Sequence, residues 1–473
     1  MKNSYIYMVG EILPRILNFL MLPIMTSYLS PEDYGIIGYV DAIILFVFIF
    51  SVLALNSYLL REYFELNTLK ARKKLIGNFF LFIIIYNFVL FFVLFFLIHF
   101  TFQFVDVQFE ILPILSIALI CNLIEIFCLF PQIIYRVQER PLAYVYFAVS
   151  KTFFAIIAIV FFLEFYYEDH GPISKYYGIT LSAGVYAVFS YLIVRKNAIF
   201  SFNIEQLKDG FVFSLPLVLA ALSFTVIDMS DRIILEEYVS MKEIGIYSIA
   251  YTLGFSINVI IKGSYKAFEP LIFKNSKKDN FLNIFTSIKG QYLALVLVAC
   301  LFVILFSKEI IVLILPDAYY EAYLLMPILV LAAFAKGIYT IQVLLLMIKK
   351  DTKLVSKIMI LGALINVGIN FIFIEDYGSI VAALSTFAAF SIMAILAHQK
   401  GFRYYNLSYS IEIKDYMFFL LLGIGVYVMY FYFNIPVTIF AILIKIIILF
   451  LLVVIIYRFY NLSMFKSAIK RTD

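Results

Sequence analysis

Residues 78–100 read NFFLFIIIYNFVLFFVLFFLIHF, an apolar run without Asp, Glu, Lys or Arg. About 20 apolar residues in a helix cross the hydrocarbon layer of a membrane, so this run predicts a transmembrane helix. Runs of the same kind recur along the whole chain, separated by short polar stretches. The predicted spans are 6–27, 36–59, 78–100, 111–132, 142–163, 177–194, 211–234, 244–270, 286–307, 324–347, 354–374, 378–398, 416–434 and 437–457. The sequence therefore predicts an all-α integral membrane protein with about fourteen transmembrane helices.

The composition of the chain agrees with this class. Of its 473 residues, 64% are hydrophobic and 14% are charged, and the mean hydropathy is +1.01. A water-soluble chain of this length needs more polar residues to cover its core. The first span carries Glu11 and Arg15 and lacks a small-residue cleavage site, so we expect it to be retained and not removed as a signal peptide.

Basic residues predict the orientation of the helices. The loops on one side hold only Lys175, Lys242 and Lys308. The loops on the other side are rich in Lys and Arg, including Lys70, Arg72, Lys73, Lys74, Arg195, Lys196, Lys277, Lys278, Lys349, Lys350, Lys353, Lys400 and Arg403. Basic loops stay in the cytoplasm, so we expect both termini there. The net charge of +5 reflects this orientation and gives no reason to expect a nucleic-acid partner.

Chemical motifs are sparse. Cys121, Cys128 and Cys300 lie in apolar spans, so neither a disulfide nor a metal site is expected. The histidines are scattered, and the chain has no G-x-x-x-x-G-K-[ST] sequence for nucleotide binding. The outer loops are too short for a catalytic domain. We therefore predict a transporter, with no enzymatic activity and no cofactor.

An internal repeat predicts the domain organisation. Residues 28–42 (YLSPEDYGIIGYVDA) and 238–252 (YVSMKEIGIYSIAYT) share Tyr, Ser, an acid, Gly and Ile at an offset of 210. Two further matches are Glu139 and Leu142 with Asp351 and Leu354, at an offset of 212, and Tyr177-Gly178 with Tyr377-Gly378, at an offset of 200. Six helices per copy give both copies the same orientation, with the substrate path between them.

The repeat thus predicts two parallel six-helix lobes around a central cavity. Their limits, followed by those of an appended helix pair and a cytoplasmic tail, are 1–196, 211–400, 415–458 and 459–473.

Three segments resemble the polysaccharide transporter family, and the resemblance spans nearly the whole chain. They are residues 22–42 (LPIMTSYLSPEDYGIIGYVDA), 231–251 (DRIILEEYVSMKEIGIYSIAY) and 366–383 (NVGINFIFIEDYGSIVAA). In the third, Val381-Ala382-Ala383 stands where the family usually has Gly-Ala-Ala. The family belongs to the multidrug/oligosaccharidyl-lipid/polysaccharide flippase superfamily.

The resemblance implies an alternating-access flippase in the bacterial cytoplasmic membrane. Its expected substrate is an undecaprenyl-diphosphate-linked oligosaccharide unit for O-antigen, capsule or exopolysaccharide. Expected partners are membrane lipid, a polysaccharide polymerase and chain-length proteins. Two members of the same superfamily stay open as alternatives, a peptidoglycan-precursor (lipid II) flippase and a multidrug or cation antiporter. A membrane-embedded polysaccharide polymerase would need a large outer loop, which this chain lacks.

Ionisable residues inside the spans are candidates for the substrate site. Each costs roughly 3 kcal/mol when it faces lipid, so most must face protein or water. Cations in a dehydrated cavity bind diphosphate oxygens strongly. The predicted substrate-binding cations are Arg15, Lys151, Lys336, Lys262, Lys266 and Arg232. The alternatives are ion pairs between helices, snorkelling of Lys262 and Lys266 to the interface, and a structural or lipid-contacting role for Lys445. Residues 15–19 (RILNF) also resemble the first helix of peptidoglycan-precursor flippases.

One polar face follows helical spacing through residues 247–269. Its predicted cavity-lining members are Tyr247, Tyr251, Asn258 and Tyr265. Carboxylates elsewhere in the spans could bind a coupling proton or sodium ion, and the candidates are Glu11, Glu125, Asp228 and Asp231. Glu11 could instead pair with Arg15, and Arg232 with one of the two Asp residues.

Overall fold

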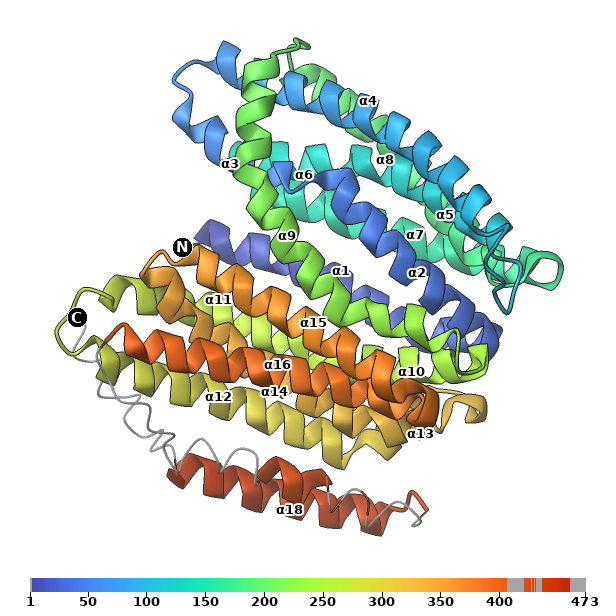
Figure 1. The fold of residues 1–473 in the computed structure, drawn as a ribbon, viewed down its shortest axis with the longest axis vertical. Helices are drawn as coiled ribbons and strands as arrows, with labels where there is room; N and C mark the ends of the chain where they lie inside the picture. Colours follow the sequence, from blue (N-terminus) through green and yellow to red (C-terminus); the bar gives the residue numbers. More distant parts are fainter. Residues whose placement is uncertain (1, 406–420, 427, 429, 431–435, 460–473) are drawn as a thin grey trace. The chain divides into compact units, whose positions relative to one another are not determined.

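The computed structural model describes residues 2–405, 421–426, 428, 430 and 436–459, and every secondary-structure element of these residues is a helix (Figure 1). Thirteen segments of this part are long and apolar enough to cross a membrane. They correspond to thirteen of the predicted spans, and the remaining one, 416–434, lies largely outside the described residues. The predicted all-α membrane class is confirmed.

The chain divides into two compact units, Met1–Gly245 and Ile246–Asp473. The first contains α1 (Lys2–Tyr28), α2 (Pro31–Val52), α3 (Leu55–Glu65), α4 (Leu69–Thr101), α5 (Ile111–Glu125), η1 (Ile126–Cys128), α6 (Leu129–Val137), α7 (Pro141–His170), α8 (Ile173–Asn197) and α9 (Ile204–Leu235). α10 (Met241–Gly254) begins in the first unit and continues in the second. The second unit then contains η2 (Phe255–Ile257), α11 (Asn258–Asn275), α12 (Phe281–Leu305), α13 (Ser307–Ile314), η3 (Asp317–Tyr319), α14 (Ala322–Ile348), α15 (Thr352–Tyr377), α16 (Ser379–Arg403) and α18 (Ile439–Phe459). The predicted lobe limits stay a prediction.

Three of the predicted spans are interrupted helices. The span 36–59 breaks between α2 and α3, where Leu53 and Ala54 both have left-handed backbone conformation with φ of 51° and 52°. Two others contain a 3₁₀ segment, η1 between α5 and α6 and η2 between α10 and α11. Left-handed residues and 3₁₀ turns release helical hydrogen bonds, which must find other partners inside a membrane.

Polar side chains supply partners at the end of α2. The Nδ2 atom of Asn87 donates to the carbonyl oxygen of Ser51 at 2.9 Å, and Nδ2 of Asn122 donates to the Ser51 hydroxyl at 2.9 Å. All three residues are buried. They line a cavity of about 10 Å³, close to the smallest volume that holds one water molecule. Hydrogen bonds from buried side chains therefore stabilise the break between α2 and α3.

Corresponding helices pack in the same way within each unit. In the first, α7 packs against α8, and α5 packs against α8. In the second, α15 packs against α16, and α14 packs against α16. By this packing, α5 corresponds to α14, α7 to α15 and α8 to α16.

The turns between these helices also share their backbone geometry. Glu139 and Lys350 are the left-handed residues of the turns before α7 and α15, with φ of 53° and 60°. In each turn the next residue closes a hydrogen bond to a carbonyl five residues earlier, Arg140 to Tyr135 at 2.8 Å and Asp351 to Leu346 at 3.1 Å. These are helix C-terminal motifs at an offset of 211. The sequence match at an offset of 212 is wrong by one residue.

The third sequence match is wrong as well. Tyr177 and Gly178 lie inside α8, whereas Tyr377 and Gly378 end α15. The residue equivalent to Gly378 is Gly171, which follows α7. Both glycines have left-handed φ, 57° with ψ −137° and 55° with ψ −138°, a conformation that glycine adopts at low cost. A two-letter match in apolar sequence gave the wrong register because it ignored this turn.

Candidate functional site

The polar face of α1 holds the first predicted cation. Arg15 is the middle residue of α1 and is exposed. Within the part of the chain that the structure describes, its guanidinium makes no hydrogen bond or ion pair. Glu11, one turn earlier, pairs with Arg136 of α6 at 2.9 Å rather than with Arg15. Arg136 also donates to the Tyr144 hydroxyl at 3.2 Å. α1 thus presents one carboxylate with a partner and one cation available to a ligand.

Lys151 and Glu125 form a close ion pair in the first unit. The Lys151 Nζ atom lies 2.5 Å from Oε2 of Glu125, and the two side chains are 17% and 28% exposed. Glu125 is the last residue of α5, so the pair joins α7 to the 3₁₀ break at η1. Each charge neutralises the other, which lowers the cost of keeping both away from water. Lys151 as a substrate ligand and Glu125 as an ion-coupling site stay predictions.

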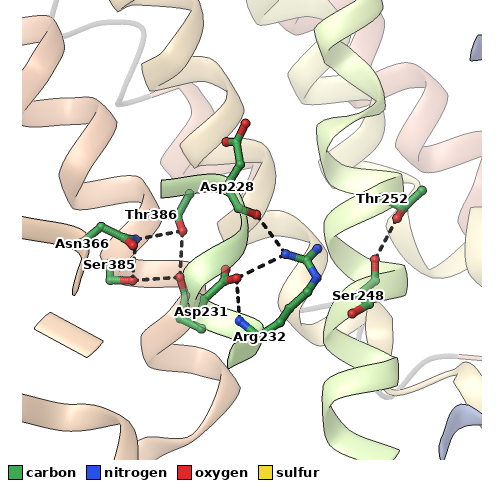
Figure 2. Close-up of polar contacts among 9 residues, drawn as sticks. Asp228, Asp231, Arg232, Ser248, Thr252, Asn366, Ser385 and Thr386 are labelled. Atoms are coloured by element: carbon green, nitrogen blue, oxygen red, sulfur yellow. Dashed lines mark hydrogen bonds and ion pairs between the residues drawn. The ribbon is translucent and has the colours of Figure 1, made fainter. Parts of the chain in front are cut away.

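A buried charged cluster lies near the end of α9 (Figure 2). Arg232 Nη1 lies 3.2 Å from Oδ1 of Asp231 and donates to the carbonyl oxygen of Asp228 at 2.9 Å. Asp231 is fully buried and Arg232 is 4% exposed. The expected alternative that Arg232 pairs with one Asp is confirmed. A guanidinium so enclosed is held by its own helix, which makes a structural role the simpler account of it.

The polar face predicted for 247–269 does not lie on one continuous helix. The segment η2 advances by about 120° per residue instead of about 100°, so the residues before it and after it point in different directions. Tyr247 and Tyr251 are buried, and the Tyr251 ring stacks on Phe255 with centroids 4.2 Å apart. This half of the face is therefore buried.

The half of the face on α11 is more accessible. Lys262 and Lys266 are exposed, and the Tyr265 hydroxyl donates to Glu269 at 3.0 Å. The Oδ1 atom of Asn258, at the start of α11, is buried without a hydrogen bond. Lys262 and Lys266 as substrate ligands, and Tyr265 as a cavity-lining residue, stay predictions.

Lys336 on α14 lies among aromatic rings. Its Nζ atom is 4.8 Å from the centroid of Phe390 on α16 and 5.3 Å from that of Phe255. A ring face stabilises a cation without neutralising its charge. Lys336 as a substrate-binding cation stays a prediction.

Two further contacts tie helices of the second unit together. Lys445 of α18, 1% exposed, lies 2.6 Å from Glu309 of α13, so its predicted structural role has a specific partner. The buried Asn366 of α15 donates to Ser385 at 3.1 Å and to Thr386 at 3.3 Å on α16 (Figure 2). The side chains in this part of the resemblance therefore join two helices.

Three charged residues inside the predicted spans were missed by the sequence interpretation, namely Asp41, Lys289 and Lys357. Asp41 of α2 accepts from Lys175 at 2.6 Å and from the Tyr176 hydroxyl at 2.7 Å. Lys289 of α12 is 5% exposed. The three lie in the predicted spans 36–59, 286–307 and 354–374, so a complete scan of the spans for charged residues would have found them.

Sequence comparison gives the family-level relationship. A profile of the family described as "Polysaccharide biosynthesis protein" matches residues 1–276, more than half of the chain. The capsular polysaccharide biosynthesis protein CapF of Staphylococcus aureus is 23% identical over 331 residues, which cover 65% of this chain and 78% of CapF.

Solved structures share the fold. The lipid II flippase MurJ in its inward closed conformation superposes with a TM-score of 0.72 at 17% identity, covering 98% of this chain and 99% of MurJ. An inward-facing multidrug resistance MATE family transporter of the MOP superfamily superposes with a TM-score of 0.66 at 15% identity, covering 85% of this chain and 98% of that one. At such identities the likeness establishes the fold alone, a fold found in transporters.

Proposed function

Because this multi-pass membrane protein belongs to the polysaccharide biosynthesis protein family, we propose that it is a lipid-linked oligosaccharide flippase. It moves undecaprenyl-diphosphate-linked repeat units from the cytoplasmic to the outer leaflet of the bacterial cytoplasmic membrane by alternating access. The diphosphate crosses beside cations of the protein, while the polyprenyl tail stays in lipid. Both termini lie in the cytoplasm, where the substrate is made. A polymerase and chain-length proteins act on the product.

Arg15 is the observation that carries this proposal. It lies at the middle of α1, is exposed, and makes no ion pair with the described residues. An unpaired cation at mid-membrane is too costly to face lipid, so it requires water or an anionic ligand. A guanidinium holds two phosphate oxygens at once through its fork of donors. A diphosphate moving through the membrane is the anion that such a residue suits.

The extent of the structural likeness favours a flippase over an antiporter. The flippase MurJ covers 98% of the chain and the MATE transporter covers 85%. Of the two alternative functions, that of a lipid II flippase is therefore better supported than that of an antiporter. The relationship to CapF supports a capsular or similar surface polymer as the end product.

The test is to neutralise Arg15 in cells that depend on this protein for their surface polysaccharide. With Arg15→Ala we expect surface polymer to fall about tenfold or more, since hydrogen bonds to charged groups contribute ~1.5–3 kcal/mol. Arg15→Lys should keep part of the activity, because the charge remains and the forked geometry is lost. Protein level in the membrane should stay unchanged.

Arg61→Ala is the matched control, because Arg61 is an exposed arginine on α3 that pairs with Glu65 at 2.9 Å. It should leave polymer at the wild-type level. Normal polymer in the Arg15→Ala strain would refute the proposed diphosphate site.

A further inference from the structure

The second helix of each repeat copy, α2 or α10, starts with a capping serine and an acidic residue three positions later. The Ser30 hydroxyl accepts from the Asp33 N–H at 3.2 Å, and the Asp33 carboxylate accepts from the Ser30 N–H at 2.9 Å, ahead of α2. Ser240 accepts from the Glu243 N–H at 3.3 Å ahead of α10. The serine and the acidic residue three positions later, which recur in both repeat copies, thus mark a helix N-terminus. A glycine follows the acid by two residues in each copy.

These glycines, Gly35 and Gly245, bring the two helix starts into contact. A Cβ atom on Gly35 would lie 1.9 Å from the carbonyl oxygen of Met241, and one on Gly245 would lie 1.8 Å from that of Pro31. Pro31 and Met241 are the first residues of α2 and α10, and both pairs are related by the offset of 210. The contact is therefore reciprocal, and any side chain at either glycine would force the helices apart.

This contact lies close to the point where the chain passes from one unit to the other. It lies inside the first unit, which ends at Gly245, whereas α10 continues to Gly254 in the second. The helix that makes the contact is therefore shared by both units. Backbone CH groups against carbonyl oxygens hold surfaces together weakly. Such a contact can open without separating charges.

A second contact holds the loop before α10 to the same unit. The Gln108 side chain donates to the carbonyl oxygens of Glu236 at 2.5 Å and Val239 at 2.8 Å, and the Gln108 N–H donates to the Glu236 carboxylate at 2.9 Å. Burial raises the pKa of Glu236 above its usual range. The start of α10 is thus fastened at two points, one on each side of Ser240.

We infer that Pro31, Gly35, Met241 and Gly245 form a latch that parts once in each transport cycle. The inference rests on the proposed function, because alternating access requires an opening on the outer side that admits the glycan. The proposed orientation puts the starts of α2 and α10 on that side. Equivalent residues of the two repeat copies face each other across the latch, so it opens when α2 and α10 separate.

Thiol labelling tests whether the latch opens and closes in equilibrium. Met241→Cys supplies a reporter that is buried while the latch is closed, since Met241 is 6% exposed. The native thiols of Cys121, Cys128 and Cys300 are buried, so the unsubstituted protein gives the background. A membrane-impermeant maleimide is added to intact cells. We expect Gly35→Ala and Gly245→Ala each to label at least about fivefold faster than the reporter alone, because overpacking penalties correspond to equilibrium shifts of that size.

Gly184→Ala is the matched control, because a Cβ atom there meets nothing within 4 Å. It should label at the rate of the reporter alone. If Gly35→Ala and Gly245→Ala also label at that rate while accumulating normally, the latch is refuted.

Crosslinking tests the latch even where the alanine variants accumulate poorly. Glu32 and Lys242 are exposed and directly follow Pro31 and Met241. With Glu32→Cys and Lys242→Cys together, a short bis-maleimide should reduce polymer export about tenfold, and a monofunctional maleimide should not, because only a bridge prevents the helices from parting. Undiminished export by crosslinked protein would overturn the inference. Labelling rates report the latch, while polymer in the Arg15→Ala strain reports the flippase, so either proposal can fail alone.

Discussion

At the scale of single residues, carboxylates of the first unit lie against basic side chains. Glu125 pairs with Lys151, Glu11 with Arg136, and Asp41 with Lys175, at 2.5–2.9 Å. A paired charge is cheaper to hold in a membrane than an isolated one. These ion pairs therefore connect helices of the first unit. Arg15 differs from the paired residues because it makes no ion pair with the described residues.

The pair of Lys151 and Glu125 can be separated from substrate binding by a double substitution. Lys151→Ala alone leaves the carboxylate without its partner and should destabilise the protein by up to about 3 kcal/mol. We expect Lys151→Ala with Glu125→Ala to restore both membrane level and polymer export, because no unpaired charge remains. The measurements are quantitative blots of membranes and assays of surface polymer. Restored protein level without export would instead make Lys151 a ligand of the substrate.

At the scale of helices, glycines in α8 separate close packing from open surface. A Cβ atom on Gly178 would lie 2.5 Å from the backbone of Ile159 in α7, whereas one on Gly184 meets nothing within 4 Å. Small residues allow membrane helices to approach closely, and that approach replaces the hydrophobic effect as the force between them. The contact of α7 with α8 therefore depends on one of these two glycines.

Alanine substitutions test this directly. Gly178→Ala should destabilise the purified protein by about 1–3 kcal/mol, the usual cost of overpacking a tight contact. Gly184→Ala should change stability little or raise it by up to about 1 kcal/mol, since alanine favours helix more than glycine does. Thermal unfolding in detergent, followed by circular dichroism or by exposure of buried thiols, measures both. Equal stability of the two variants would contradict the packing account.

At the scale of the whole molecule, the helix order fixes which loops share a side. Asp169 lies near the C-terminal end of α7, and Lys196 lies near the C-terminal end of α8. The whole of α8 therefore separates the two residues. Glu237 and Lys278 lie at opposite ends of the segment from α10 to α11. A multi-pass protein must therefore expose the members of each pair on opposite faces of the membrane.

Reporter fusions test the proposed orientation. We expect fusions after Lys196 and Lys278 to report the cytoplasm, and fusions near Asp169 and Glu237 to report the outside, because basic loops are retained inside. Alkaline phosphatase and green fluorescent protein give opposite signals at each site. The reverse pattern would invert the orientation, and would put the latch between α2 and α10 on the cytoplasmic side.

The sequence by itself determined the class of the protein, thirteen spans now seen as helices, and the repeated motif at the starts of α2 and α10. These features depend on apolar run length and on residues within one turn, so they can be read locally. Only the tertiary structure decided which charges pair, since Lys151 and Glu125 are 26 residues apart and Lys445 and Glu309 are 136 apart. It also decided where spans break and that Gly35 meets the start of α10. Such contacts depend on the rotation of each helix about its axis and on the partner it meets, and neither quantity is encoded within a single span.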